Sequence, residues 1–162
     1  MNLHYFVPFE EVEPKDLGFV VIREFVDRKG KVYEEEKLPA GEELWVRLIL
    51  LTPNLTNHVI VEDKLPAGVE AVNESLATSS ILNVEKIKVG EDRQSLYFRH
   101  NEIRDDRVVL FAETLPAGVY EYMYRVRPTT PGRYHHPPAQ AYNMYVPDIS
   151  GHSSGGWMEV SE

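Results

Sequence analysis

The sequence predicts an all-β protein, specifically a β-sandwich of antiparallel sheets, with a closed barrel as the alternative. Three observations favour this fold class. Short segments rich in β-branched and aromatic residues recur along the 162 residues. Most of the eleven prolines and ten glycines lie between these segments, as turns and strand ends require. Finally, no apolar face at helical spacing persists along the chain. The length fits one domain.

The first half of the chain contains three predicted strands. Residues 17–26 (LGFVVIREFV) and residues 44–52 (LWVRLILLT) each combine β-branched, aromatic and long aliphatic side chains and stop at turn-forming residues. Residues 58–63 (HVIVED) are β-branched at their centre, and a strand there places Val59 and Val61 on one face. These segments supply the first strands of the sandwich.

The second half repeats the pattern. Residues 96–99, 107–112 (RVVLFA) and 120–127 (YEYMYRVR) are predicted strands, and residues 156–160 form a last short one. Residues 73–82 have room for a single helical turn at most. About seven short strands separated by polar turns are typical of a sandwich.

The tetrapeptide Leu-Pro-Ala-Gly occurs three times, at residues 38–41, 65–68 and 115–118. Proline presets φ near −65° and glycine accepts a positive φ, so Pro-Ala-Gly predicts a compact reversal. The preceding leucine is then placed to fill the core. Because the spacing of the copies is unequal, we interpret them as the same turn chemistry reused within one domain, and not as a solenoid repeat.

The domain is predicted to span residues 17–162. Residues 1–16 carry prolines and glutamates unlike a central strand and are interpreted as a tether, or the end of a preceding domain. Residues 150–156 are rich in glycine and serine and are predicted to form a mobile loop.

Charge and hydropathy exclude several partners. Seventeen basic and 26 acidic residues give a net charge of −9, which phosphate backbones and anionic lipids repel. We therefore expect no nucleic-acid partner. No apolar run approaches the length of a membrane span, so no direct membrane insertion is expected. The amino terminus is not a signal peptide, so the chain is either cytoplasmic or an internal piece of a longer exported protein.

The sequence predicts neither a catalytic centre nor a metal or cofactor site. It contains no cysteine, which excludes disulfides and thiolate chemistry. His135 and His136 are adjacent, so on a strand they point to opposite faces and do not share an ion. Residues 104–107 (RDDR) set two aspartates between two arginines, which favours ionised, paired carboxylates in a turn. No nucleophile elbow or phosphate-binding glycine loop is present.

Two aromatic groups remain. Tyr120, Tyr122 and Tyr124 alternate along one predicted strand and are expected to line one sheet face. Residues 134–147 (YHHPPAQAYNMYVP) are rich in aromatic residues and proline, low in charge, and too interrupted for a regular strand. They form either a docking surface or a simple cover for one end of the sandwich.

Over about residues 17–161, the sequence resembles the C-terminal domain of bacterial alpha-2-macroglobulins. The matching pieces occur in the order found in the family, and it is the whole series that is specific. They are GFVVIREF (18–25), VRL (46–48), VEDKLPAG (61–68), IRDDRVVLFA (103–112), LPAG (115–118), YMYRVR (122–127), TPG (130–132), PPA (137–139) and MYVP (144–147).

The resemblance implies a macroglobulin-like β-sandwich that belongs to a large endopeptidase inhibitor of the bacterial cell envelope or periplasm, with a role in host defence. In this family, cleavage of a bait region triggers a conformational change, and in many members a thioester then captures the protease. The C-terminal domain packs against the thioester domain and shields the bond. A tyrosine of the domain contacts the thioester. Tyr145 is the best match and Tyr142 the second, with Met144 beside Tyr145 in the same motif.

Without cysteine this chain cannot form the Cys-Gln thioester itself, and it is too short to hold a bait region. It is therefore interpreted as a non-catalytic domain whose partners are the thioester domain and the other macroglobulin-like domains of one parent chain, with proteases met through that parent. The alternative is a stand-alone β-sandwich that serves as an adhesion or structural module. A third hypothesis is a carbohydrate-binding sandwich that uses its tyrosines.

Overall fold

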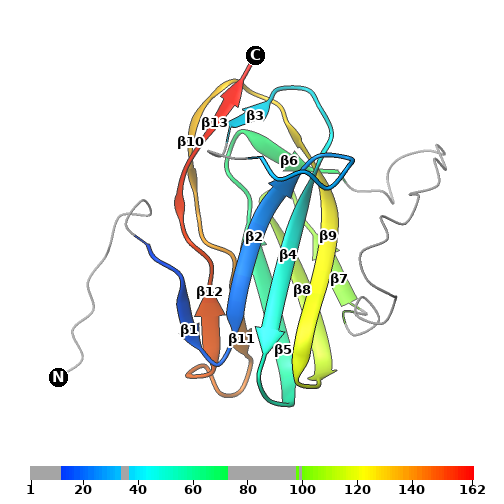
Figure 1. Cartoon of the computed structure of the whole chain (residues 1–162), viewed down its shortest axis with the longest axis vertical. Helices are drawn as coiled ribbons and strands as arrows, with labels where there is room; N and C mark the ends of the chain where they lie inside the picture. The colour runs from blue at the N-terminus through cyan, green and yellow to red at the C-terminus, as the bar shows by residue number, and fades with distance from the viewer. Residues whose placement is uncertain (1–11, 34–36, 73–97, 99) are drawn as a thin grey trace.

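The computed structural model describes residues 12–33, 37–72, 98 and 100–162, and all regular structure among them is strand (Figure 1). The strands form a six-stranded sheet in the order β1-β12-β11-β5-β8-β7, a four-stranded sheet in the order β2-β4-β9-β6, and a three-stranded sheet in the order β10-β13-β3. Their bounds are β1 Lys15–Leu17, β2 Val20–Val26, β3 Lys37–Pro39, β4 Leu44–Thr52, β5 Thr56–Lys64, β6 Val69–Ala71, β7 His100–Ile103, β8 Arg107–Leu115, β9 Gly118–Pro128, β10 Gly132–His136, β11 Gln140–Asn143, β12 Ser150–His152 and β13 Gly156–Ser161.

The predicted antiparallel sandwich is confirmed. The four-stranded sheet lies in front of the six-stranded sheet in Figure 1, and the core fills the space between them. Strand alternation explains this arrangement: in β4 the side chains of Leu44, Val46, Leu48 and Leu50 are buried while those between them are half-exposed. Among the strands of the described residues, β13 and β3 form the one parallel pair. Because the strands form separate sheets, the barrel alternative is wrong.

The three Leu-Pro-Ala-Gly copies differ in backbone conformation, and of their glycines Gly41 alone has the expected positive φ. Leu38 and Leu115 are fully buried, as predicted, whereas Leu65 is half-buried against the core. Gly41 has a left-handed φ of 80°. At Gly68 the reason for glycine is space, since a Cβ there would lie 2.2 Å from Cε2 of Tyr134.

A buried ionic network joins the two main sheets. Arg23 of β2 donates from Nη1 to Oδ1 of Asp63 in β5 at 2.6 Å, and the Tyr124 hydroxyl of β9 donates to Oδ2 of Asp63, also at 2.6 Å. The side chains of Arg23 and Asp63 are almost completely buried. Burial, together with the neighbouring Asp63 carboxylate, raises the pKa of Tyr124 well above its ordinary value. The network fixes how β5 sits across β2 and β9.

Two segments that were predicted to be irregular contain strands in the structure. Residues 150–152, expected in a mobile loop, form β12 between β1 and β11. The small residues there serve close packing, because a Cβ on Gly151 would lie 1.8 Å from the backbone oxygen of Phe19. Residues 134–147, expected to be irregular, contribute three residues to β10 and all of β11.

The remaining boundaries differ in smaller ways. Lys15 and Asp16, which the sequence places in the tether, form β1 with Leu17 and pair with β12. The predicted helical turn at 73–82 lies outside the described residues. Of the predicted strand at 96–99 only Phe98 is described, and its buried ring packs edge-on against Tyr120 and Tyr122.

Candidate functional site: an apolar end with a fixed aromatic loop

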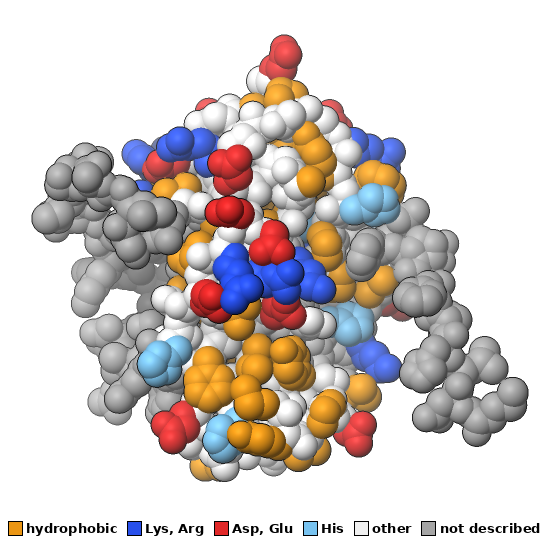
Figure 2. Space-filling model, turned by 180° about the vertical axis from the view of Figure 1, so that it is seen from behind, with side chains coloured by type: hydrophobic (Ala, Val, Ile, Leu, Met, Phe, Trp, Pro, Cys, Tyr) orange, Lys and Arg blue, Asp and Glu red, His pale blue; other side chains and the backbone are white. Residues whose placement is uncertain are grey.

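One end of the sandwich exposes a group of large apolar side chains. It is formed by the junction of β1 and β2, the β4–β5 turn and the β11–β12 loop (Figure 1). Tyr145 is 71% exposed and Met144 43% exposed. Viewed from behind, hydrophobic side chains gather over this lower part, while charged side chains cross the middle (Figure 2). We call the exposed group at this end the apolar end; its members are Leu17, Leu55, Met144, Tyr145 and Val146.

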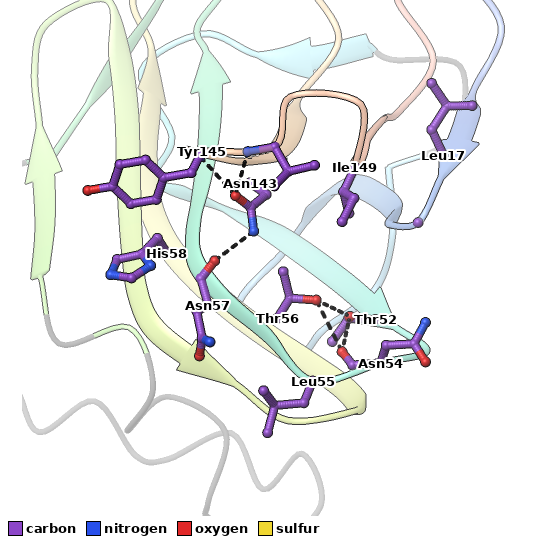
Figure 3. Close-up of a pocket in the computed structure, with 12 residues that line it drawn as sticks. Leu17, Thr52, Asn54, Leu55, Thr56, Asn57, His58, Asn143, Tyr145 and Ile149 are labelled. Carbon is purple, nitrogen blue, oxygen red and sulfur yellow. Dashed lines mark hydrogen bonds between the residues drawn. The ribbon is translucent and has the colours of Figure 1, made fainter.

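Asn143 fixes the backbone that carries Tyr145. This buried last residue of β11 accepts hydrogen bonds at Oδ1 from the backbone N–H groups of Tyr145 (2.8 Å) and Val146 (2.9 Å) (Figure 3). Such side-chain mimicry of a turn is typical of asparagine. The loop then closes on itself, because the N–H of Ile149 donates to the oxygen of Val146 and the N–H of Asn143 donates to the oxygen of Ile149.

His58 is the second support of this loop. Its oxygen accepts a hydrogen bond from the N–H of Met144 at 2.9 Å. Its imidazole packs edge-to-face with the ring of Tyr145, with ring centroids 4.9 Å apart and planes at 84°. The ring of Phe111 in β8 also lies near the imidazole, at 6.5 Å between centroids. Figure 3 shows His58 and Tyr145 side by side at the edge of the site.

A shallow recess of about 430 Å³ lies beside Tyr145. Leu17, Leu55, Val146 and Ile149 are among the side chains that line it. The threonine hydroxyls in the lining are already used, because Oγ1 of Thr52 and Oγ1 of Thr56 both donate to the backbone oxygen of Asn54. The recess therefore offers a partner the apolar side chains of Leu17, Leu55, Val146 and Ile149, with Asn54 and Asn57 also in its lining.

The structure brings two of the three predicted contact residues together and sets the third nearby. Met144 and Tyr145 are neighbours in the exposed loop. Tyr142 is half-buried on the outer face of the six-stranded sheet, because its neighbour Ala141 is buried on the inner face. It pairs with Ile60, which pairs in turn with Phe111. Sequence reasoning missed Asn143 and His58, which hold the loop.

The other predicted sites have structural partners. The turn between β7 and β8 contains the two aspartates, and a hydrogen bond from Arg107 lowers the pKa of Asp106, as the paired interpretation requires. His135 packs against Trp157 at 3.8 Å between centroids, whereas His136 is buried beside Phe25. The two histidines therefore lie on opposite faces of β10, as predicted.

The tyrosines of β9 line one face of their sheet, as predicted, and the structure shows that this is the inner face. Tyr120 and Tyr124 are buried and Tyr122 is half-buried beside them. Within the described part of the chain, no group of three or more His, Asp or Glu side chains is arranged to hold a metal ion. Among those same residues, no helix is long and apolar enough to cross a membrane.

Comparison with known proteins shows the family of this domain. The family described as the bacterial alpha-2-macroglobulin MG10 domain matches residues 18–148. An alpha-2-macroglobulin homolog of Nostoc sp. is 31% identical over 138 residues, which is 83% of this chain and 7% of the relative. The alpha-2-macroglobulin of Xylella fastidiosa is 28% identical over 148 residues, which is 90% of this chain and 9% of the relative.

Solved structures agree with the sequence relatives. Escherichia coli alpha-2-macroglobulin activated by porcine elastase matches 93% of this chain and 14% of its own, with a TM-score of 0.79 at 24% identity, and shows the same fold. Salmonella alpha-2-macroglobulin reacted with methylamine matches 93% of this chain and 10% of its own, with a TM-score of 0.74 at 26% identity. The chain thus spans less than a tenth of these curated relatives and belongs to the bacterial alpha-2-macroglobulin MG10 domain family.

Proposed function

We propose that this chain is the C-terminal macroglobulin-like domain of a bacterial endopeptidase inhibitor, and that its apolar end packs against the thioester domain of the parent protein and shields the bond. Tyr145, with Met144 beside it, is the contact residue, and Tyr142 is the second candidate. The domain has no catalytic role. Its partners are the thioester domain and the other macroglobulin-like domains of the parent, through which it meets proteases in the periplasm or cell envelope.

The observation that carries the proposal is an exposed aromatic ring on a fixed backbone. Tyr145 leaves most of its surface to solvent although its loop is tied down by hydrogen bonds to Asn143 and by the loop's own backbone bonds. Monomeric soluble proteins seldom expose a group of large apolar side chains on a fixed loop, so such a surface indicates a partner. A fixed loop also loses little conformational entropy when it docks.

The chemistry of a thioester suits this surface. The bond survives only where water is excluded and no nucleophile aligns with it. A tyrosine ring covers apolar area while its hydroxyl keeps a polar contact. Because triggering must expose the bond, the cover has to detach, and a small interface built on a few apolar side chains and a shallow recess fits that requirement.

The relatives support an amine-reactive group in proteins of this kind. The Salmonella protein has been obtained in a form reacted with methylamine. A thioester is open to attack by a small amine, which releases one thiol. The amount and rate of thiol release therefore report how well the bond is covered.

The test uses the parent protein that carries this domain. We expect the Tyr145→Gly variant to release thiol on methylamine treatment faster than the unchanged parent, because water and amine gain access. The Tyr145→Phe variant keeps the ring and separates cover by the ring from contact by the hydroxyl. Tyr142→Gly tests the second candidate in the same assay.

Two results would overturn the proposal. If the parent releases no thiol with methylamine, there is no thioester for this domain to shield. If Tyr145→Gly and Tyr142→Gly both leave the rate unchanged, neither tyrosine covers the bond.

A further inference from the structure

We propose that His58 is a positioning residue for Tyr145: its imidazole holds the tyrosine ring in the orientation that the domain presents to its partner. This inference deepens the proposed function and rests on it. Asn143 and the backbone bonds of the loop fix the position of the Tyr145 main chain, but they do not fix its χ1 angle. The edge-to-face contact with His58, at 4.9 Å and 84°, supplies that second constraint.

The backbone of His58 explains how its ring reaches Tyr145. Its φ of 53° is left-handed, and it is the one described non-glycine residue with a positive φ. Histidine is among the non-glycine residues enriched in this conformation. In a regular strand Thr56 and Val59 would face opposite sides, yet both are buried here. The left-handed residue therefore shifts the phase of β5, so that Asn57 and His58 follow each other on the outside.

Strand β8 shifts its alternation of buried and exposed residues opposite the same part of β5. Glu113 and Thr114 are consecutive exposed residues, after which Leu115 returns to the core. The pairing register between the two strands stays constant, with Asn57 opposite Thr114 and Val59 opposite Ala112. The end of the sheet thus turns as a unit. His58 keeps its backbone bond to Met144 of the neighbouring chain segment, while its ring lies beside the ring of Tyr145 (Figure 3).

The left-handed backbone of His58 indicates that this residue does more than fill space. A left-handed conformation costs free energy for any residue with a Cβ, and glycine would adopt it more readily. Histidine at this position instead supplies a flat ring that contacts Tyr145 and lies near the ring of Phe111, and a carbonyl for the Met144 N–H. The carbonyl is common to every residue type, so the ring contact is what the histidine side chain adds.

The first test uses this 162-residue chain with tyrosines labelled for NMR. His58→Asn is the variant, because asparagine also accepts a left-handed φ and so preserves the backbone. His100→Asn is the matched control, since His100 is an exposed histidine that also pairs beside Phe111. We expect the ratio of the major to the minor χ1 rotamers of Tyr145 to fall about two- to tenfold in His58→Asn and to stay unchanged in His100→Asn.

The backbone amide spectrum of His58→Asn shows whether the fold is retained. If it is retained and Tyr145 keeps its rotamer ratio, the proposal is overturned. If the spectrum shows that the loop has moved, Tyr145→Ala provides the second measurement: a positioned ring protects His58 from solvent, so hydrogen exchange at the imidazole C2 position accelerates in Tyr145→Ala. An unchanged exchange rate overturns the proposal in that case.

The second test separates this inference from the proposed function. In the parent protein, methylamine-driven thiol release is expected to accelerate in His58→Asn by about two- to tenfold and by less than in Tyr145→Gly. If Tyr145→Gly accelerates release and His58→Asn does not, His58 has no positioning role while the shielding function stands. If Tyr145→Gly has no effect, the shielding by Tyr145 fails, and the rotamer measurement alone decides whether His58 orients the ring.

Discussion

The side-chain amide of Asn143 donates a hydrogen bond to the backbone oxygen of Asn57 at 2.8 Å and so ties the β11–β12 loop to the start of β5. The same side chain accepts the N–H groups of Tyr145 and Val146. Asn143 thus makes the exposed loop and the β4–β5 end one unit, and the contact between His58 and Tyr145 forms within that unit.

Asn143→Ala is expected to destabilise the domain by about 1–3 kcal/mol, because three partly buried backbone groups lose their hydrogen-bond partner at once. The free energy of unfolding from urea titration measures this. Asn101→Ala is the control, since Asn101 is an exposed residue whose side chain donates to the Tyr122 hydroxyl; its cost is expected to stay below about 1 kcal/mol. Equal costs for the two variants would contradict the role assigned to Asn143.

Arg23→Ala is expected to cost about 3–5 kcal/mol, because it leaves the Asp63 carboxylate buried without its cation. The double variant Arg23→Met with Asp63→Leu removes both charges and leaves only the neutral Tyr124 hydroxyl without its acceptor, so its cost is expected to be smaller than that of Arg23→Ala. Urea titration of both proteins decides this. A double variant as unstable as the single one would show that the ion pair itself carries the stability.

Tyr124 predicts a loss of stability in alkaline solution. Its pKa is raised in the folded state, so between the unfolded and folded values the unfolded chain binds fewer protons, and stability falls as pH rises above about 10. Burial also raises the pKa of Tyr33, which adds to the fall. Tyr124→Phe is therefore expected to show a shallower decline between about pH 10 and 12. The free energy of unfolding as a function of pH tests this, and an unchanged slope would count against it.

Gly68→Ala and Gly118→Ala form a matched pair, because each changes the last residue of a Leu-Pro-Ala-Gly copy. At Gly68 the new methyl group would meet the Tyr134 ring at 2.2 Å, and that ring is held by a hydrogen bond from its hydroxyl to the oxygen of Thr130. At Gly118 the nearest atom would be at an ordinary 3.6 Å. We expect a cost of about 1–3 kcal/mol for Gly68→Ala and less than about 1 kcal/mol for Gly118→Ala, read from thermal unfolding. The reverse order would contradict the packing described.

Much of the fold follows from local pattern. The run of β-branched, aromatic and long aliphatic residues at 44–52, which stops at a proline and an asparagine, predicts β4 to the residue. The β12 strand was missed because its glycine reads as loop, although glycine there permits the approach of the Phe19 backbone. Asp63 likewise reads as the polar end of a strand, and only the tertiary structure brings Arg23 and Tyr124 to it.

In the candidate site, too, the sequence indicates some residues and only the structure reveals the others. The family resemblance points to Tyr145, with Met144 in the same motif, and to Tyr142 as the second candidate; the structure shows how exposed each of them is. Asn143 and His58 carry no pattern of their own in the sequence. Asparagine before an aromatic loop is a weak turn signal, and the left-handed φ of His58 depends on the pairing of β5 with β8 and β11.

The central claim is that the apolar end is covered in the intact parent protein and uncovered when the parent is triggered. Hydroxyl-radical footprinting measures this directly, because Tyr145 and Met144 both carry oxidisable side chains and both are exposed in this chain. We expect strong protection of both residues in the untreated parent and oxidation near the level of the isolated chain after methylamine treatment. Equal oxidation of Tyr145 and Met144 in the untreated parent and in the isolated chain would contradict it.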